Sequence, residues 1–409
     1  MTRMQGKPFL EEGTSAIHGL RRALSEALES LGAPLDEPQE VSRRYALDKT
    51  LTWRVARLIG ERDVWEAVAH VPRRPSFKIF IDALTKKGLA KEIAADVNDA
   101  VENFERFVVT HAGDRETLEI MASVMSKRSS EKRLEAFRRD GYLAASAIWG
   151  VRADAQIVAH FVSPGSIAGR VDCATVCGLA GFRRLRINVP WAIATIRMWD
   201  TSEEMGDAYE RSFEPVDNAN ERGSAPLMRE FCSRDLAPVT TVKHDSRTMR
   251  LMLEGNELGN TGATDVFLGW INRNFAPALE SYEGEWGEHG VSVTTPCAEF
   301  VHDLYIHRDL NFMFEEKGRV FSQLPGGAQY MTHGPDQALE LPVPNDVADL
   351  GVDMSDGDIS AFPRYREMVH IAAQRLNADL RDFEIRRYRL THPPIPSMMV
   401  MRHTLGRRP

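Results

Sequence analysis

Hydrophobic residues recur at helical spacing through the first 149 residues of the chain. Apolar side chains return every three or four positions, and glycines and prolines separate successive runs. The clearest stripes cover residues 17–31, 47–58, 77–84 and 93–108. Amphipathic helices with short connections are typical of a compact bundle, so residues 14–149 are predicted to be all-helical.

The pattern changes after Gly150. Residues 155–162 have strand periodicity with apolar side chains on both faces, which indicates a strand covered on both sides. Residues 265–279 instead show helical spacing through Phe267, Trp270 and Ile271, and are predicted to form a helix. Further strands are expected at 186–198, 239–243, 248–253, 299–306 and 319–324, and in two terminal segments joined by the sequence PPIP.

The order of these elements predicts the fold class and the domains. Strands and helices mix after residue 150 without a regular βαβ alternation, which favours α+β: an all-helical N-terminal domain followed by a mixed, mostly antiparallel C-terminal domain. Residues 1–40 are expected to be a leader helix and a linker, loosely attached. Residues 41–150 form the predicted helical, basic domain, and residues 151–409 the α+β domain. Its residues 331–360 contain seven acidic and no basic side chains, which predicts an exposed acidic loop.

The overall composition is that of a water-soluble globular protein. Of the 409 residues, 43% are hydrophobic and 27% charged, and the net charge of −8 argues against general affinity for nucleic acid or membranes. No apolar run approaches the roughly 18 residues that span a bilayer. The first residues lack the apolar run of a signal peptide, so a cytoplasmic location is expected. Cys173 and Cys177 lack the spacing of a zinc or redox pair, and neither metal nor cofactor is predicted.

Positive charge is concentrated in residues 41–91. This segment has twelve Lys or Arg against five Asp or Glu, a local net charge of +7. Such clusters bind phosphate backbones, and short helices joined by tight turns are the components of helix-turn-helix domains. A DNA-binding surface is therefore predicted, although the same cations could simply solvate the outside of a bundle. The predicted contact residues are Arg54, Arg57, Arg73, Arg74 and Lys78.

A different hypothesis starts from the basic C-terminal strands. Their cations could pair with the acidic loop of a neighbouring copy, which would make the protein a self-assembling homo-oligomer. The alternative is a charged sheet edge that discourages aggregation. The residues concerned are Arg386, Arg387, Arg389, Arg402, His403, Arg407 and Arg408.

The remaining hypothesis is an enzyme with a site near Asp303 and His307. Together with His302, these residues form the best metal-like cluster in the chain. If the segment is a strand, His302 and His307 point to opposite faces, whereas Asp303 and His307 share a face about 13 Å apart. Histidines with a purely structural role in a sheet are the competing interpretation.

The charge asymmetry between the two halves favours one of these three hypotheses. We expect a nucleic-acid-binding regulator, with a helical N-terminal domain that binds DNA and a C-terminal domain that oligomerises or senses a ligand. No motif in the sequence is specific enough to assign catalytic residues.

Overall fold

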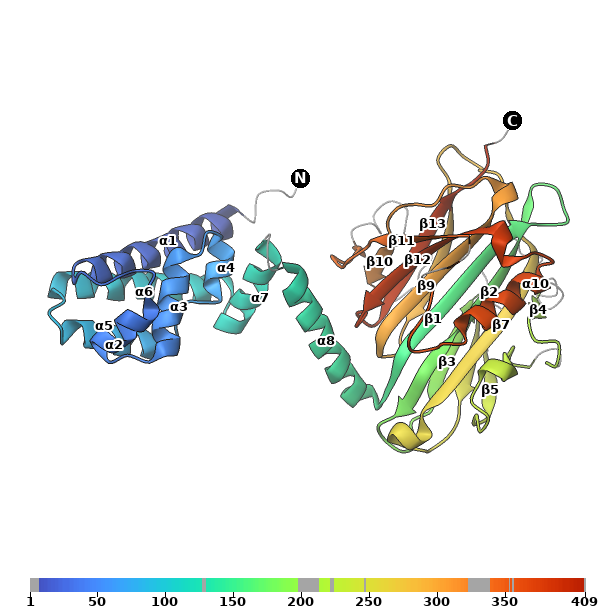
Figure 1. Ribbon diagram of the computed structural model, residues 1–409, viewed down its shortest axis with the longest axis horizontal. Coiled ribbons are helices and arrows are strands. Elements are labelled where there is room, and N and C mark those ends of the chain that lie inside the picture. The colour runs from blue at the N-terminus through green and yellow to red at the C-terminus, as the bar shows by residue number, and fades with distance from the viewer. Residues whose placement is uncertain are drawn as a thin grey trace. The chain divides into compact units, whose positions relative to one another are not determined.

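The fold is α+β, as predicted. The computed structural model describes residues 7–126, 130–197, 213–220, 224–245, 248–322, 339–352, 354 and 357–407. Helices make up the N-terminal part, and mostly antiparallel sheets dominate the C-terminal part (Figure 1). The chain forms two compact units, Met1–Leu134 and Glu135–Pro409.

The N-terminal unit is a bundle of helices around one hydrophobic core. Short connections join successive helices, which matches the predicted compact bundle. Helix α8 (Ser130–Trp149) follows the bundle, and the division between the two units falls within it. The bundle helices are α1 (Lys7–Glu29), α2 (Pro38–Tyr45), α3 (Lys49–Gly60), α4 (Val64–Val68), α5 (Arg74–Thr85), α6 (Lys91–His111) and α7 (Arg115–Met125).

Helix α1 belongs to this core. Its residues Ile17, Leu20 and Leu24 are fully buried, and α1 packs along α6 (Figure 1). The apolar stripe of a helix is stabilised only when a neighbour covers it. Helix α1 is therefore an integral part of the bundle, where the sequence suggested a loosely attached leader.

The C-terminal unit is built on a seven-stranded sheet. Its order is β11-β12-β9-β1-β2-β7-β4, and every neighbouring pair is antiparallel except the parallel pair β1 and β9. Two three-stranded sheets accompany it, in the orders β10-β13-β8 and β3-β6-β5. The strands are β1 (Val151–Pro164), β2 (Arg170–Arg184), β3 (Trp191–Arg197), β4 (Phe213–Pro215), β5 (Val239–Asp245), β6 (Thr248–Leu253), β7 (Thr264–Pro277), β8 (Trp286–Val293), β9 (Cys297–His307), β10 (Arg319–Ser322), β11 (Val347–Gly351), β12 (Phe383–Thr391) and β13 (Ser397–Thr404).

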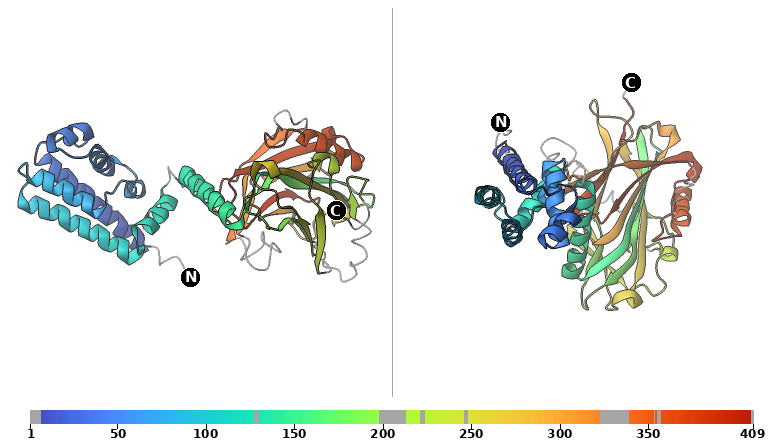
Figure 2. Two further views of the ribbon diagram at one scale, coloured as in Figure 1. Left: turned by 90° about the horizontal axis from the view of Figure 1, so that it is seen from below. Right: turned by 60° about the vertical axis from the view of Figure 1, so that its left-hand side comes forward.

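Both faces of the large sheet are covered. Helix α10 (Tyr365–Arg375) lies on one face (Figure 2). Its apolar residues share a core with Ile157 and Phe161 of β1. The opposite face packs against the two small sheets, with Val158 of β1 and Met399 of β13 in the same core. Coverage on both faces explains the continuous apolar composition of the central strands.

Two predictions for this half were wrong in detail. Residues 264–277 form strand β7, not a helix, because an apolar run that is buried on both faces also places residues at helical spacing. Residues 347–351, within the predicted acidic loop, form the edge strand β11 and pair with β12. Part of that loop, residues 331–338, lies outside the described residues.

Candidate nucleic-acid interface

One face of helix α3 carries a strip of exposed cationic and polar residues around a tryptophan. Its buried residues are Leu51, Thr52, Val55 and Leu58, which fix the opposite face to the bundle core. The positions left on the outside recur at helical spacing and so form one continuous surface. They are Lys49, Thr50, Trp53, Arg54 and Arg57, and we call them the α3 face.

Asp48 determines where α3 begins. Its carboxylate accepts hydrogen bonds from the backbone N–H groups of Thr50, at 2.8 Å, and Leu51, at 3.1 Å. Such a cap satisfies donors that a helix start otherwise leaves without partners. These backbone hydrogen bonds also lower the pKa of Asp48. The cap fixes the position of Lys49 and Thr50 at the first turn, and of Trp53 one turn later.

Trp53 is the centre of this surface. It is 48% exposed, and because Trp149 is exposed to a similar degree, 50%, the neighbours of Trp53 rather than its exposure distinguish this site. The guanidinium of Arg57 lies over its ring, 5.8 Å from the centroid. The imidazole of His70 meets the ring edge-on, with centroids 5.5 Å apart and planes at 88°. A cation and two aromatic rings thus share one site.

The pKa of His70 reflects both its burial and the charges near it. Burial lowers the pKa of His70, and the positive charges of Arg57, Arg133 and Arg54 lower it further, against the opposing effect of Glu61. Each of these guanidinium groups is therefore close enough to disfavour a further positive charge on the imidazole. The α3 face is electropositive as a local surface, although the whole chain is acidic.

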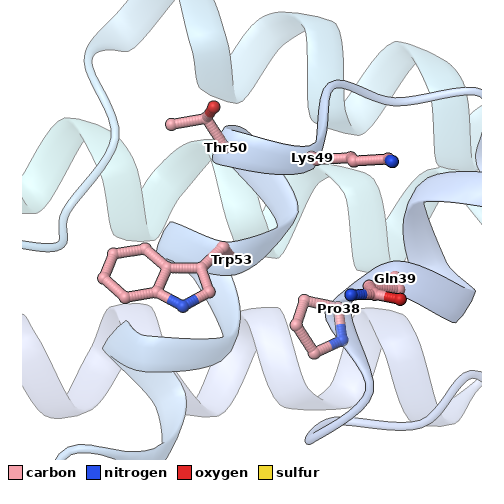
Figure 3. Close-up of a pocket in the computed structure, with 5 residues that line it drawn as sticks. All are labelled: Pro38, Gln39, Lys49, Thr50 and Trp53. Atoms are coloured by element: carbon pink, nitrogen blue, oxygen red, sulfur yellow. The ribbon is translucent and has the colours of Figure 1, made fainter.

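A pocket of about 330 Å³ lies beside the tryptophan (Figure 3). Pro38 and Gln39 come from the first turn of α2, and Lys49 and Thr50 from the first turn of α3. Trp53 completes the lining. The pocket therefore combines two apolar rings, an amide, a hydroxyl and an ammonium group.

The five predicted contact residues divide between two helices. Arg54 and Arg57 are on the α3 face, whereas Arg73, Arg74 and Lys78 are exposed at the start of α5. Arg57 pairs with Glu61 at 3.4 Å, where the Glu61 side chain is only 11% exposed, and Arg74 pairs with Glu102 at 3.5 Å through largely exposed side chains. An exposed pair such as Arg74–Glu102 contributes little to stability. Within the described parts of the chain, Arg54, Arg73 and Lys78 have no ion pair.

The predicted contact residues, chosen for their charge, did not include Trp53. Trp53 lies off the apolar stripe of residues 47–58, on the same side as Arg54 and Arg57, and this was the available signal. Pro38 and Gln39 fell in a predicted linker. Their approach to α3 depends on how α2 packs, which no local pattern encodes.

Asp303, the centre of the enzyme hypothesis, is part of a buried ion pair. Its side chain is fully buried and accepts hydrogen bonds of 2.7 Å from Nε and from a terminal nitrogen of Arg387. The hydroxyl of Tyr365 also donates to it, at 2.5 Å. All of its oxygens therefore have partners inside the protein. His307 lies four residues along β9, partly exposed, with its ring edge-on to Phe383.

His302 faces the other side of β9 and belongs to a row of histidines between the sheets. Nε2 of His302 is 2.8 Å from Nδ1 of His160, and Nε2 of His289 is 3.2 Å from Nε2 of His403. The rings of His160 and His289 connect the two pairs, with centroids 5.2 Å apart. Among the described residues, no group of three His, Cys, Asp or Glu side chains is arranged to hold a metal ion.

Arginines of the basic terminal strands form ion pairs within the chain, whereas the predicted residue Arg408 lies outside the described residues. Arg386 forms an ion pair with Asp349 of β11, and Arg389 pairs with Glu299 at 3.1 Å. Arg402 forms two hydrogen bonds of 2.7 Å with Glu315. These cations do not require the acidic loop of a neighbouring copy as their partner.

The sequence matches no protein-family model and no curated protein. Among the described helices, none combines the length and the apolarity needed to cross a membrane.

Proposed function

We propose that the N-terminal helical unit binds nucleic acid through the α3 face. The observation that carries this proposal is the arrangement of Lys49, Arg54 and Arg57 around the half-exposed indole of Trp53. Cations on a helix bind the phosphate backbone, and an exposed aromatic ring offers a surface for bases. Both kinds of group are present on one short helix.

The alternative for the same cations is that they only solvate the bundle. Solvating side chains are exposed and need no aromatic partner and no pocket. The α3 face has both features, and its segment has a local charge of +7 in a chain of −8. These features favour a specific anionic partner over simple solvation.

The C-terminal unit then supplies the second part of a regulator, either oligomerisation or the sensing of a ligand. Its core is separate from that of the helical bundle, which suits a two-part protein. A reducing compartment such as the cytoplasm suits this chain, because its cysteines Cys173, Cys177, Cys232 and Cys297 are all free.

A pair of charge-matched variants tests the proposal. Binding of the full chain to fluorescently labelled DNA would be measured by anisotropy for Arg54→Gln/Arg57→Gln and for Lys86→Gln/Lys87→Gln. Both variants lose two exposed cations from the basic segment, but only the first loses them from the α3 face. We expect the first to bind more weakly than the second. Equal affinities, or no binding by the unmodified chain at low salt, would refute the proposal.

A further inference from the structure

We infer that the pocket beside Trp53 receives an unpaired base, so that the α3 face prefers single-stranded nucleic acid to a duplex. This inference rests on the function proposed above and specifies its ligand. The preference for a single strand depends on the neutral residues that line the pocket, and not only on the cations.

The apolar lining of the pocket, which is open to solvent, suits a flat ring. Trp53 and Pro38 contribute rings from two different helices, and the volume of about 330 Å³ is at the lower end of the range for small-molecule sites. Bases stack on aromatic side chains of single-strand-binding proteins irrespective of sequence, since every base has a π-face. In a duplex, that face is covered by neighbouring base pairs.

The polar lining suits the edge and the phosphate of a nucleotide. The amide of Gln39 and the hydroxyl of Thr50 can each donate and accept a hydrogen bond, so they can pair with the edge of any base. Lys49 adds an ammonium group at the same pocket. Arg57, over the indole, and Arg54 extend the positive charge along α3 to adjacent phosphates.

The structure also favours nucleic acid over a peptide as the occupant. An apolar pocket alone would suit a proline-containing or aromatic peptide equally well. Here the pocket is bordered by cations, and Arg54 has no ion pair among the described residues. A strand with regularly spaced phosphates meets the stacking ring and these cations at the same time.

The experiment compares three probes of equal length with the full chain: a single-stranded oligothymidine, the same backbone with abasic sites, and a duplex. Trp53→Ala is expected to weaken binding to the oligothymidine by about tenfold or more, because stacking is lost. Binding to the abasic strand and the duplex should change little. Trp53→Phe, which keeps an aromatic face, should retain most of the affinity. Because Trp53 is half exposed, Trp53→Ala should fold like the parent, and circular dichroism would verify this.

The outcomes separate this inference from the proposed function. If the unmodified chain binds all three probes equally and Trp53→Ala binds as well as the parent, the pocket does not take a base, but the cationic face still binds phosphates. If the chain binds none of the probes at low salt, both ideas are wrong. A preference for the oligothymidine that disappears in Trp53→Ala, while Arg54→Gln/Arg57→Gln weakens binding to every probe, supports both.

Discussion

Asp303 and Arg387 are joined by two hydrogen bonds of 2.7 Å in the interior of the C-terminal unit, 84 residues apart in sequence. The strands β9 and β12 place them directly opposite each other in the sheet. Tyr365 of α10 adds a third hydrogen bond to the same carboxylate. Burial and the negative charge of Asp303 raise the pKa of Tyr365 well above its usual value, so its hydroxyl remains a donor. This network ties α10 to the large sheet.

Removing one partner of this pair should destabilise the protein strongly. Arg387→Met leaves a buried carboxylate without its counter-charge, and we expect a loss of about 3–5 kcal/mol in the free energy of unfolding. The double variant Asp303→Leu/Arg387→Met removes both charges and should be more stable than Arg387→Met alone. Urea-induced unfolding of the three proteins measures this. A double variant less stable than Arg387→Met would show that the unpaired carboxylate of Asp303 is not the cause of the loss.

The histidine row predicts acid sensitivity of the contact between the sheets. Burial lowers the pKa of His302 to about 3 and that of His403 to about 4, and burial with neighbouring histidines lowers those of His160 and His289. Between these values and the unfolded pKa of about 6.5, the unfolded chain binds more protons than the folded one. The stabilisation is therefore complete above about pH 6.5 and is lost as the pH falls toward the folded pKa values of about 4 and about 3.

Hydrogen exchange of strands β8 and β13 as a function of pH would measure this effect. Each buried imidazole should reduce the free energy of opening by up to about 1.4 kcal/mol per pH unit below 6.5. His302→Phe, which cannot titrate, should give a shallower decline, whereas His18→Gln, on the exposed side of α1, should behave like the parent. A pH-independent opening free energy between pH 7 and pH 4 in the parent would rule out this role for the row.

Gly287 of β8 should be intolerant of any side chain. It lies opposite His403 of β13, and a Cβ at this position would collide with the imidazole ring. Phe312 stacks on the same ring, with centroids 4.8 Å apart, which limits its freedom to move away. Gly287→Ala should therefore cost about 1–3 kcal/mol of stability.

Gly290, three residues further along β8, provides the control for Gly287→Ala. A Cβ at Gly290 would meet Sδ of Met398 at 3.2 Å, and a methionine side chain can adjust. Thermal unfolding should show a lower melting temperature for Gly287→Ala and a nearly unchanged one for Gly290→Ala. Equal melting temperatures would mean that His403 is not held where the structure places it.

The sequence predicted the helical half and the fold class because these depend on local periodicity. It failed at β7, where Phe267, Trp270 and Ile271 point to both buried faces of a central strand and so imitate a helical stripe. It also could not find the pairing of Asp303 with Arg387 or the contact of His302 with His160. Those depend on which strands are neighbours and in what register, and the chain encodes this only through its tertiary packing.

In the candidate interface, too, some residues could be predicted from local sequence and others depend on tertiary packing. Arg54 and Arg57 follow from counting charge on one helix, and Trp53 could have been found from its place on their side of α3. The pocket itself required the packing of α2 against α3, which brings Pro38 and Gln39 to Trp53. Arg73, Arg74 and Lys78 were predicted from the same charge count, and their role in binding remains a prediction.

The salt dependence of binding to a random-sequence duplex tests the central proposal most directly. Three cations of the α3 face, Lys49, Arg54 and Arg57, would displace counterions from about three phosphates. The logarithm of the association constant of the full chain should then fall linearly with the logarithm of salt concentration, with a slope of about −2.7, at roughly 0.9 per phosphate. In Arg54→Gln/Arg57→Gln the slope should be closer to −1. An association that is undetectable at low salt with both this duplex and a single strand of the same length, or whose strength does not change with salt, would contradict the proposal that this face binds nucleic acid.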